Sequence, residues 1–173
     1  MTIRTALLAA LTTLAVAGPA WAQQTPQAQS AAPAPETQDP QKQFLAENAK
    51  KKGWKTTQSG LQYKIVKEAP FGATSPKSSD AVLVHYEGRL IDGKVFDSSF
   101  KRGEPISFPL NRVIPGWTEG VGMMREGETR ELAIPAELAY GQRGVPGTIP
   151  PGSTLLFTVE LLEILLPEAM PPR

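Results

Sequence analysis

The sequence contains no cysteine and a single histidine, His85. Disulfides, thiol nucleophiles and zinc sites built from cysteine and histidine are therefore excluded, and a serine–histidine–aspartate triad would depend on His85 alone. An excess of charge is also missing, because 18 basic residues face 17 acidic ones among 173. This balance argues against nucleic acid or an anionic membrane surface as the main partner, since either would favour a clustered basic excess.

An N-terminal apolar run is present, but it is too short to span a membrane. Residues 1–22 place Arg4 before an apolar stretch, a Gly-Pro breaker and the triplet Ala20-Trp21-Ala22. This layout predicts a secretory signal peptide that is cleaved after Ala22. The alternative is a transmembrane anchor, which needs roughly 20 apolar residues. We therefore expect an exported, periplasmic protein with no membrane span in its mature form.

The segment after the expected cleavage site lacks large apolar residues. Residues 23–43 hold seven Gln, four Pro and four Ala. Because such a segment cannot bury enough surface to offset its ordering entropy, we interpret it as a disordered linker. Residues 44–52 predict a short helix that ends at Gly53, within an approach segment that extends to residue 59. At the other end of the chain, residues 167–173 are expected to form a tail.

Alternation of apolar and polar residues predicts antiparallel strands within residues 60–166, and Asp92-Gly93 is typical of a hairpin turn. One short helix is indicated, with Pro115 in its first turn and with Trp117, Val121 and Met124 on one face. This pattern predicts an α+β domain, in which a curved antiparallel sheet (a half-barrel) wraps around one short helix. The strands are expected at residues 61–66, 81–86, 128–134 and 154–165.

Side chains suited to acid–base or phosphate chemistry are few. The glycines of residues 116–122 lack the preceding strand and the spacing of a nucleotide-binding loop. Glu126 and Glu128 lie beside a Gly turn and are interpreted as surface charges. His85 is expected on the strand face opposite Tyr86, and we interpret it as a structural residue. The sequence therefore predicts neither a cofactor nor a metal.

Aromatic and aliphatic residues are unusually frequent near turns and loops. Each of them alone is best explained as core. However, Phe96 is followed at once by Asp97 and two serines, and Tyr140 opens a Gly/Pro-rich loop at residues 140–153. Loops of this length in a compact domain are usually functional or disordered, and its prolines limit disorder here. The set comprises Tyr86, Phe96, Phe108, Val113, Ile114, Trp117, Tyr140, Ile149 and Phe157.

Four motifs in a fixed order carry a resemblance to a known family. They are VHYEGRLIDGKVFDSS from Val84, VIPGWTEGV from Val113, AYGQRG from Ala139 and IPPGSTLLFTVEL from Ile149. Together they resemble FKBP-type peptidyl-prolyl cis-trans isomerases over about residues 60–166. The approach segment, with TQSGLQY, looks like that of the macrophage-infectivity-potentiator-like periplasmic branch. The resemblance implies the same fold, a curved antiparallel sheet around a short helix.

The resemblance also implies which residues act on the substrate. Tyr86, Phe96, Asp97 and Tyr140 would be the catalytic residues. Tyr140 would offer its hydroxyl to a substrate carbonyl. Asp97 would lie at the pocket rim, held by Tyr86 and Arg102, and would act electrostatically on the twisting amide.

The remaining implied residues would bind the substrate. Trp117 would form the pocket floor, and the backbone N–H of Ile149 would be a second donor. At two positions the chain departs from the family pattern: Ile106 stands where many members place a pocket aromatic, and Val145 replaces a common loop aromatic or histidine. The other residues of the implied pocket are Phe108, Val113, Ile114 and Phe157.

The implied activity is rotation about X–Pro bonds in unfolded or partly folded exported polypeptides, in a dry pocket that needs no cofactor. A macrolide in the same pocket is a further implied ligand. We expect a monomer, because a linker and a short helix ahead of the domain offer little dimer surface. Two alternatives stay open: a periplasmic chaperone or partner-binding module with little catalysis, and a secreted virulence factor that acts on host proteins.

Overall fold

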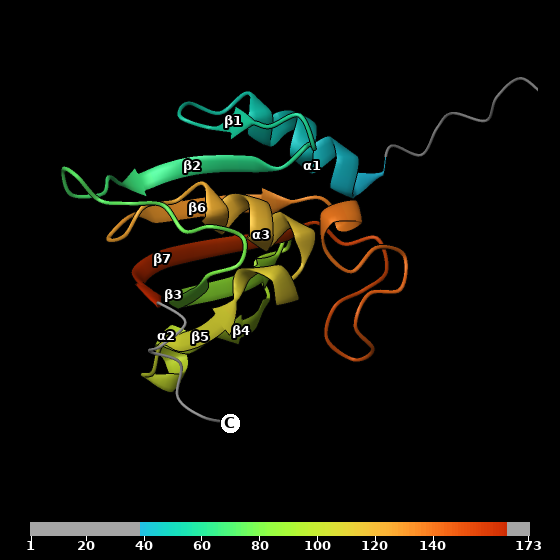
Figure 1. Cartoon of the computed structure of the whole chain (residues 1–173). Helices are drawn as coiled ribbons and strands as arrows, with labels where there is room; N and C mark the ends of the chain where they lie inside the picture. The colour runs from blue at the N-terminus through green and yellow to red at the C-terminus, as the bar shows by residue number, and fades with distance from the viewer. Residues whose placement is uncertain (1–38, 166–173) are drawn as a thin grey trace, which may run out of the picture. The chain divides into compact units, whose positions relative to one another are not determined.

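The computed structural model describes residues 39–165. The expected signal peptide, the linker as far as residue 38 and the expected tail lie outside the described residues. The described chain forms a seven-stranded antiparallel sheet in the order β1-β2-β6-β7-β3-β4, with β5 also paired to β3. Figure 1 shows this sheet curving around helix α3. The predicted α+β class, with a curved and unclosed antiparallel sheet, is therefore confirmed.

The strands are β1 (Lys55–Thr56), β2 (Gln62–Lys67), β3 (Ala81–Leu90), β4 (Val95–Ser98), β5 (Ile106–Pro109), β6 (Thr129–Ile134) and β7 (Leu155–Leu165). The α-helices are α1 (Pro40–Ala49), α2 (Ser99–Arg102) and α3 (Pro115–Gly122), and two 3-10 turns are η1 (Leu110–Arg112) and η2 (Ala136–Leu138). The long strands β3 and β7 pair along their whole lengths at the centre of the sheet.

The expected hairpin at Asp92-Gly93 joins β3 to β4. The N–H of Leu90 donates to the carbonyl of Lys94 at 2.9 Å, and the N–H of Gly93 donates to that of Leu90 at 2.9 Å. Gly93 has φ +88°, a left-handed conformation that glycine adopts without a steric penalty. Because this hairpin is tight, β4 returns directly beside the half of β3 that begins at Tyr86.

Helix α3 packs very closely on the sheet through two glycines one turn apart. A Cβ on Gly116 would lie 2.3 Å from the Cγ2 of Ile134, and one on Gly120 would lie 2.8 Å from the Cδ1 of Leu132. The glycines noted in the sequence therefore serve packing against β6 rather than phosphate binding. Because these contacts hold α3 close to β6, they also fix the position of Trp117, which lies between the two glycines in the sequence.

The first helix begins earlier than predicted. The side chain of Asp39 caps it by accepting from the N–H of Gln41 at 2.9 Å, and Pro40 occupies the first turn. The helix covers residues 40–49 instead of 44–52, so the last residues of the expected linker are helical. Composition concealed this cap, because the Gln/Pro-rich run continues into the helix.

Amide side chains attach α1 to the domain. The Nδ2 of Asn48 donates to Gln62 at 2.9 Å, and Gln62 donates to the carbonyl of Leu45 at 2.9 Å. The N–H of Thr154 donates to the Oε1 of Gln41 at 2.8 Å. These partners lie far apart in the sequence, so alternation alone could not have revealed them.

The interpretation of Glu126 and Glu128 as surface charges is wrong for Glu128. Its side chain is buried and forms an ion pair with the buried Arg130. The turn that carries it faces the end of α3, where Glu128 also accepts from the N–H of Arg125 at 2.9 Å. Glu126 is half-buried and accepts from the N–H of Ile164 at 2.7 Å.

Candidate active site

One cavity of about 450 Å³ brings together every site residue that the sequence predicted except Ile149. Segments from β3, β4, β5, the start of α3, the loop at residues 140–153 and β7 converge on it. Its volume lies within the range of small-molecule and peptide side-chain pockets. The lining residues are Tyr86, Phe96, Asp97, Ile106, Phe108, Arg112, Val113, Ile114, Trp117, Tyr140 and Phe157.

Trp117 is the centre of an aromatic cluster in this cavity. Its ring meets those of Tyr86 and Phe157 edge to face, with centroid separations of 5.2 and 5.1 Å. The ring of Phe108 lies at 5.1 Å from it. Edge-to-face packing of this kind adds to the energy of burial and fixes ring orientation. The packed rings therefore form a rigid, largely apolar floor, in which the indole N–H of Trp117 is buried without a hydrogen-bond partner in the described chain.

Gly88 on β3 makes room for two of these rings. A Cβ at this position would lie 2.6 Å from the ring of Phe96 and 2.7 Å from that of Phe157. Such distances are shorter than van der Waals contact, so any side chain would displace both rings. The glycine of the VHYEG motif is therefore required by the aromatic wall.

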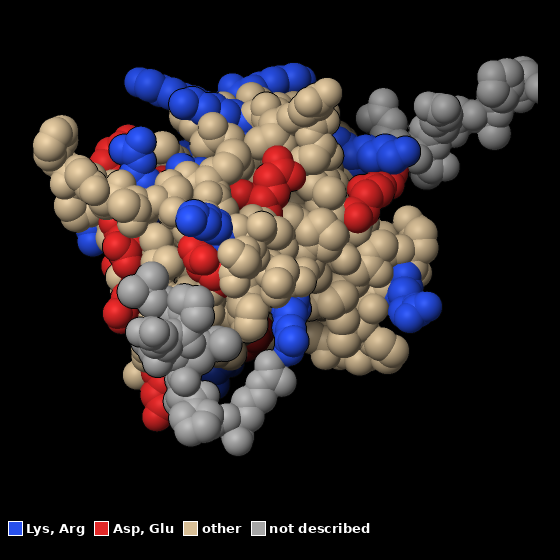
Figure 2. All heavy atoms as spheres, viewed as in Figure 1, with Lys and Arg blue, Asp and Glu red and all other residues tan. Residues whose placement is uncertain are grey.

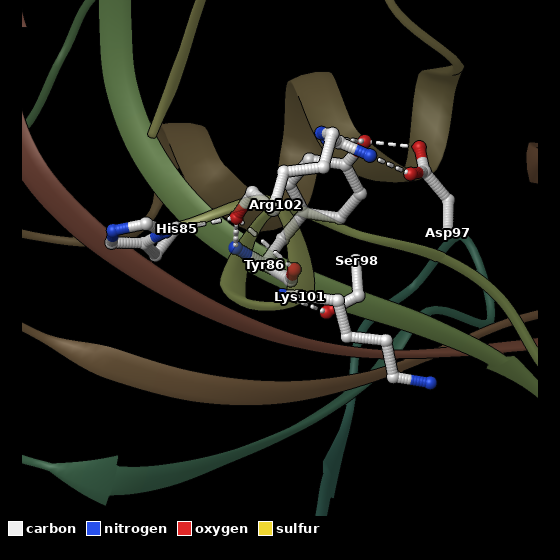
Figure 3. A network of polar contacts seen from close by, with 7 residues as sticks. His85, Tyr86, Asp97, Ser98, Lys101 and Arg102 are labelled. Atoms are coloured by element: carbon white, nitrogen blue, oxygen red, sulfur yellow. Dashed lines mark hydrogen bonds and ion pairs between the residues drawn. The ribbon is translucent and has the colours of Figure 1, made fainter. Parts of the chain in front are cut away.

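Asp97 lies at the mouth of the cavity in a small polar network (Figure 3). It accepts from the Tyr86 hydroxyl and from the Arg102 guanidinium, as the resemblance implied. Arg102 also donates to the Tyr86 oxygen at 3.3 Å. The short helix α2 returns Arg102 to this position: Ser98 caps it, and Gly103, with φ +75°, ends it.

This network fixes the protonation states at neutral pH. Burial alone would raise the pKa of Asp97, but the hydrogen bonds from Tyr86 and Arg102, with the charge of Arg102, together lower it. The pKa of Tyr86 is raised by burial and by its hydrogen bond to Asp97. The cavity therefore presents an ionised carboxylate and a neutral phenol.

His85 points away from the cavity, on the other face of β3, as predicted. Its Nδ1 lies 3.0 Å from the Oγ of Ser99, and its ring stacks on Phe100 with centroids 4.8 Å apart. Ser99 is fully buried and accepts from the N–H of Tyr86 at 2.7 Å. The paired serines after Asp97 stand out in the sequence, but no pattern there indicates this role for Ser99. These contacts hold α2 against β3.

Ile149 is the predicted site residue that lies outside the lining. Its N–H donates to the carbonyl of Val145 at 2.8 Å, and Val145 donates back to Ile149 at 2.8 Å. The amide expected to be a second donor is thus already satisfied within the loop. Ile114, by contrast, lines the cavity, and its N–H has no acceptor among residues 39–165.

Hydrogen bonds within the loop at residues 140–153 stabilise its conformation. The N–H of Gly144 donates to Tyr140 at 3.1 Å, and that of Gly152 donates to Gly141 at 2.9 Å. Gly144 has φ +60°, and a Cβ there would lie 2.3 Å from the carbonyl oxygen of Ile149. Tyr140 is therefore presented from an ordered loop, and 42% of its surface is exposed at the cavity mouth.

Other kinds of site are not apparent in the described residues. No helix within residues 39–165 has the length and apolar character that crossing a membrane requires. The same residues contain no group of three His, Asp or Glu side chains arranged to hold a metal ion. On the face drawn in Figure 2, basic and acidic side chains are interspersed. Within residues 39–165, the candidate site is thus an apolar cavity with a carboxylate at its mouth.

Comparison with known proteins gives a consistent result. The sequence profile described as FKBP-type peptidyl-prolyl cis-trans isomerase matches residues 72–162. A second profile, described as the domain amino terminal to FKBP-type peptidyl-prolyl isomerase, matches residues 4–65. The first match covers more than half of the chain and includes all of the cavity lining.

Individual relatives agree with the profiles. The FKBP-type 22 kDa peptidyl-prolyl cis-trans isomerase of Escherichia coli is 57% identical over 122 residues, which are 70% of this chain and 58% of that protein. FkpA of the same organism is 56% identical over 123 residues, 71% of this chain and 44% of FkpA. The chain thus spans about half the length of these relatives.

A solved structure extends the likeness to three dimensions. The crystal structure of FkpA from Escherichia coli superposes with a TM-score of 0.69 at 53% identity, covering 72% of this chain and 57% of that one. Together with the profile match and the cavity, this shows that the chain belongs to the FKBP-type peptidyl-prolyl cis-trans isomerase family.

Proposed function

We propose that this protein catalyses cis–trans isomerisation of X–Pro bonds in unfolded or partly folded polypeptides. The observation that carries the proposal is the aromatic cavity with an ionised Asp97 at its mouth, in a chain of this family. Neither a nucleophile nor a cofactor is needed, because no covalent bond is broken.

The apolar wall suits the chemistry of amide rotation. The barrier to rotation is roughly 20 kcal/mol and arises largely from amide resonance. Resonance separates charge between oxygen and nitrogen, and it is lost when the amide twists. A cavity floored by Trp117 and walled by Phe96 and Phe157 offers little water to the planar amide, so it favours the twisted form relative to the planar one.

The polar groups at the mouth would position the substrate. The Tyr140 hydroxyl and the N–H of Ile114 are donors without acceptors among residues 39–165, so each is available to a substrate carbonyl. Asp97 would act through its field on the twisting amide. Because Tyr86 and Arg102 already hold the carboxylate, no reorganisation is needed during the reaction.

A rate assay with short X–Pro peptides tests this proposal. Asp97→Asn removes a charge and Tyr140→Phe removes a hydroxyl, while the apolar area of the cavity is nearly unchanged. We expect each to lower the isomerisation rate constant by about tenfold, equal to about 1.4 kcal/mol, with little change in the binding of an unfolded client. Wild-type rates in both variants would remove the roles proposed for these two residues.

Trp117→Ala provides the contrasting variant. It removes the cavity floor and should weaken both catalysis and client binding, at a stability cost of roughly 3–5 kcal/mol. A macrolide that occupies the cavity should inhibit the reaction competitively.

The second candidate function is client binding with little catalysis. The exposed apolar residues at the cavity mouth favour it, since 39% of Ile106 and 42% of Tyr140 remain accessible. The same preparation is assayed for suppression of aggregation of an unfolded protein. If the wild type suppresses aggregation but shows no isomerisation above the uncatalysed rate, the binding module replaces the enzyme.

We also propose that the protein is exported to the periplasm. The positive charge, the apolar run and the Ala-x-Ala site within residues 1–22 support this. The mature chain is expected to begin at Gln23 in the periplasm. Intact-mass analysis of periplasmic material measures this directly, and a chain that retains Met1 in the inner membrane would contradict it.

We further propose that the mature protein is a monomer. The described part of its N-terminal segment, α1, is attached to the protein's own β2 through Asn48 and to Thr154, just before β7, through Gln41. Sedimentation at micromolar concentration should give the mass of one chain, and a dimer there would overturn this expectation.

A further inference from the structure

We propose that Arg112 makes the cavity selective for proline-containing segments that carry an acidic residue next to the proline. This inference rests on the proposed function and names the substrate class of the same site. Arg112 directly precedes the motif VIPGWTEGV and is not part of it.

The charges at the cavity do not balance. Among the lining residues, the charged side chains are Asp97 and Arg112. The carboxylate of Asp97 is already paired with Arg102, which stands beside the cavity. The charge of Arg112 has no such counterpart: it makes no ion pair and no side-chain hydrogen bond with any residue of the described chain, 39–165. The mouth of the cavity therefore carries one uncompensated positive charge.

The backbone that carries Arg112 is held firmly. Arg112 is the last residue of η1 and directly precedes Val113 and Ile114, which also line the cavity. Leu110, at the start of η1, is fully buried; its N–H donates to the carbonyl of Asp80 at 3.0 Å, and its carbonyl accepts from Thr118 at 2.6 Å. An exposed guanidinium on such an anchored turn keeps all of its N–H donors for a ligand.

A carboxylate is the partner that this group fits. The planar guanidinium forms paired hydrogen bonds with a carboxylate, and these are stronger than bonds between neutral groups. The mature chain is expected to be formally neutral, and basic and acidic side chains are interspersed on the face drawn in Figure 2, so no net charge of the whole chain adds to the attraction by Arg112. The attraction is therefore local to the residues that flank the bound proline.

The size of the effect follows from Coulomb's law. Two unit charges about 6 Å apart at a solvated rim attract weakly, so replacing Glu by Lys in the client should change kcat/KM by about three- to tenfold at low salt. The preference should shrink in about 1 M salt, where the screening length is about 3 Å. Because the ion pair forms equally in the ground and transition states, the change should appear in KM more than in kcat.

The experiment uses two peptide series, with Glu, Gln or Lys immediately before the proline in one and immediately after it in the other. The uncatalysed rate of each peptide is subtracted. Wild type should prefer Glu to Gln to Lys in at least one series. Arg112→Gln should remove this order, and Arg112→Glu should reverse it.

Arg125→Glu is the matched control. Arg125 is also an exposed arginine, it does not line the cavity, and its side chain makes no ion pair in the described chain. This variant should keep the wild-type order although its net charge equals that of Arg112→Glu. An unchanged ratio of Glu to Lys peptides in Arg112→Glu would overturn the inference alone. The absence of catalysis with every peptide would overturn the proposed function and this inference with it.

Discussion

Two arginine–carboxylate pairs of the same chemistry lie in very different surroundings. In the Asp97–Arg102 pair, 40% and 49% of the two side chains remain exposed at the cavity mouth. In the Glu128–Arg130 pair the values are 3% and 8%. The exposed pair has Tyr86 as its third member, whereas the buried pair joins the end of α3 to β6.

The difference in burial decides what each pair can do. Water weakens the attraction within the exposed pair, so it adds little stability, but its carboxylate can reach a ligand. The buried pair meets no ligand. Arg130 donates to the carbonyl of Met123 at 2.7 Å, and its guanidinium carbon lies 5.0 Å from the ring centroid of Tyr63. One of its nitrogens, Nη1, has no partner in the described chain, so this network is already incomplete.

The largest expected effect comes from breaking the buried pair. Glu128→Gln should lower the free energy of unfolding by about 3–5 kcal/mol, because it leaves the Arg130 charge buried without a counter-charge. The cavity is untouched, so kcat/KM per folded molecule should stay at the wild-type value. Urea unfolding and the peptide assay measure the two quantities.

A double variant separates charge burial from packing. Glu128→Gln combined with Arg130→Met removes both charges and should be more stable than Glu128→Gln alone. If the double variant is less stable than either single one, the arginine contributes through its packing on Tyr63, and the comparison of the two pairs is wrong.

The buried pair also shows what alternation could have predicted. Arg130 shares a strand face with Leu132 and Ile134, which form the core, so an arginine there needed a buried counter-charge. Glu128, two residues earlier, lies where it can supply that charge. The neighbouring glycine turn concealed this, because turns usually face solvent.

Other features depended on contacts that no local pattern contains. The strands and α3 were predicted from periodicity, and the lining of the cavity from motif order. The first turn of α1 was missed because the Gln/Pro-rich composition concealed its Asp39 cap, and the contact that holds this turn to the domain joins Gln41 to Thr154, far away in the sequence. Similarly, the sequence does not reveal that the N–H of Ile149 is used within its own loop while that of Ile114 is free.

A smaller, pH-dependent effect on the free energy of unfolding is expected from the exposed pair, Asp97 and Arg102. The pKa of Asp97 is lower in the folded protein than its ordinary value of about 4, so the ionised carboxylate stabilises the fold above that pH. This contribution is lost as the pH falls through the folded-state pKa. Because the pair is half-exposed, it should amount to less than about 1 kcal/mol.

Asp97→Asn provides the control for this acid effect. The stability difference between wild type and Asp97→Asn, measured by urea unfolding, should be constant above about pH 5 and should diminish on acidification below about pH 4. The isomerisation rates should converge over the same range, since both proteins then carry a neutral group. A difference that persists unchanged at about pH 2 would show that the pairing with Arg102 does not depend on the charge of Asp97.

The smallest expected effect is none at all, between about pH 6 and 8. Histidine is the residue type that ordinarily titrates in this range, and the single histidine of the sequence faces away from the cavity. Asp97 stays ionised and Tyr86 stays neutral throughout, because their pKa values move away from this range. The rate constant should therefore be independent of pH in this range, and a metal chelator should not change it.

His85→Phe separates the effect of His85 on stability from any effect on the rate. It removes the contact with Ser99 but keeps a ring to stack on Phe100, so it should affect stability more than the pH profile. A bell-shaped profile in wild type that flattens in His85→Phe would show that α2 transmits the charge of His85 to Asp97, and that burial alone does not decide which groups act in the site.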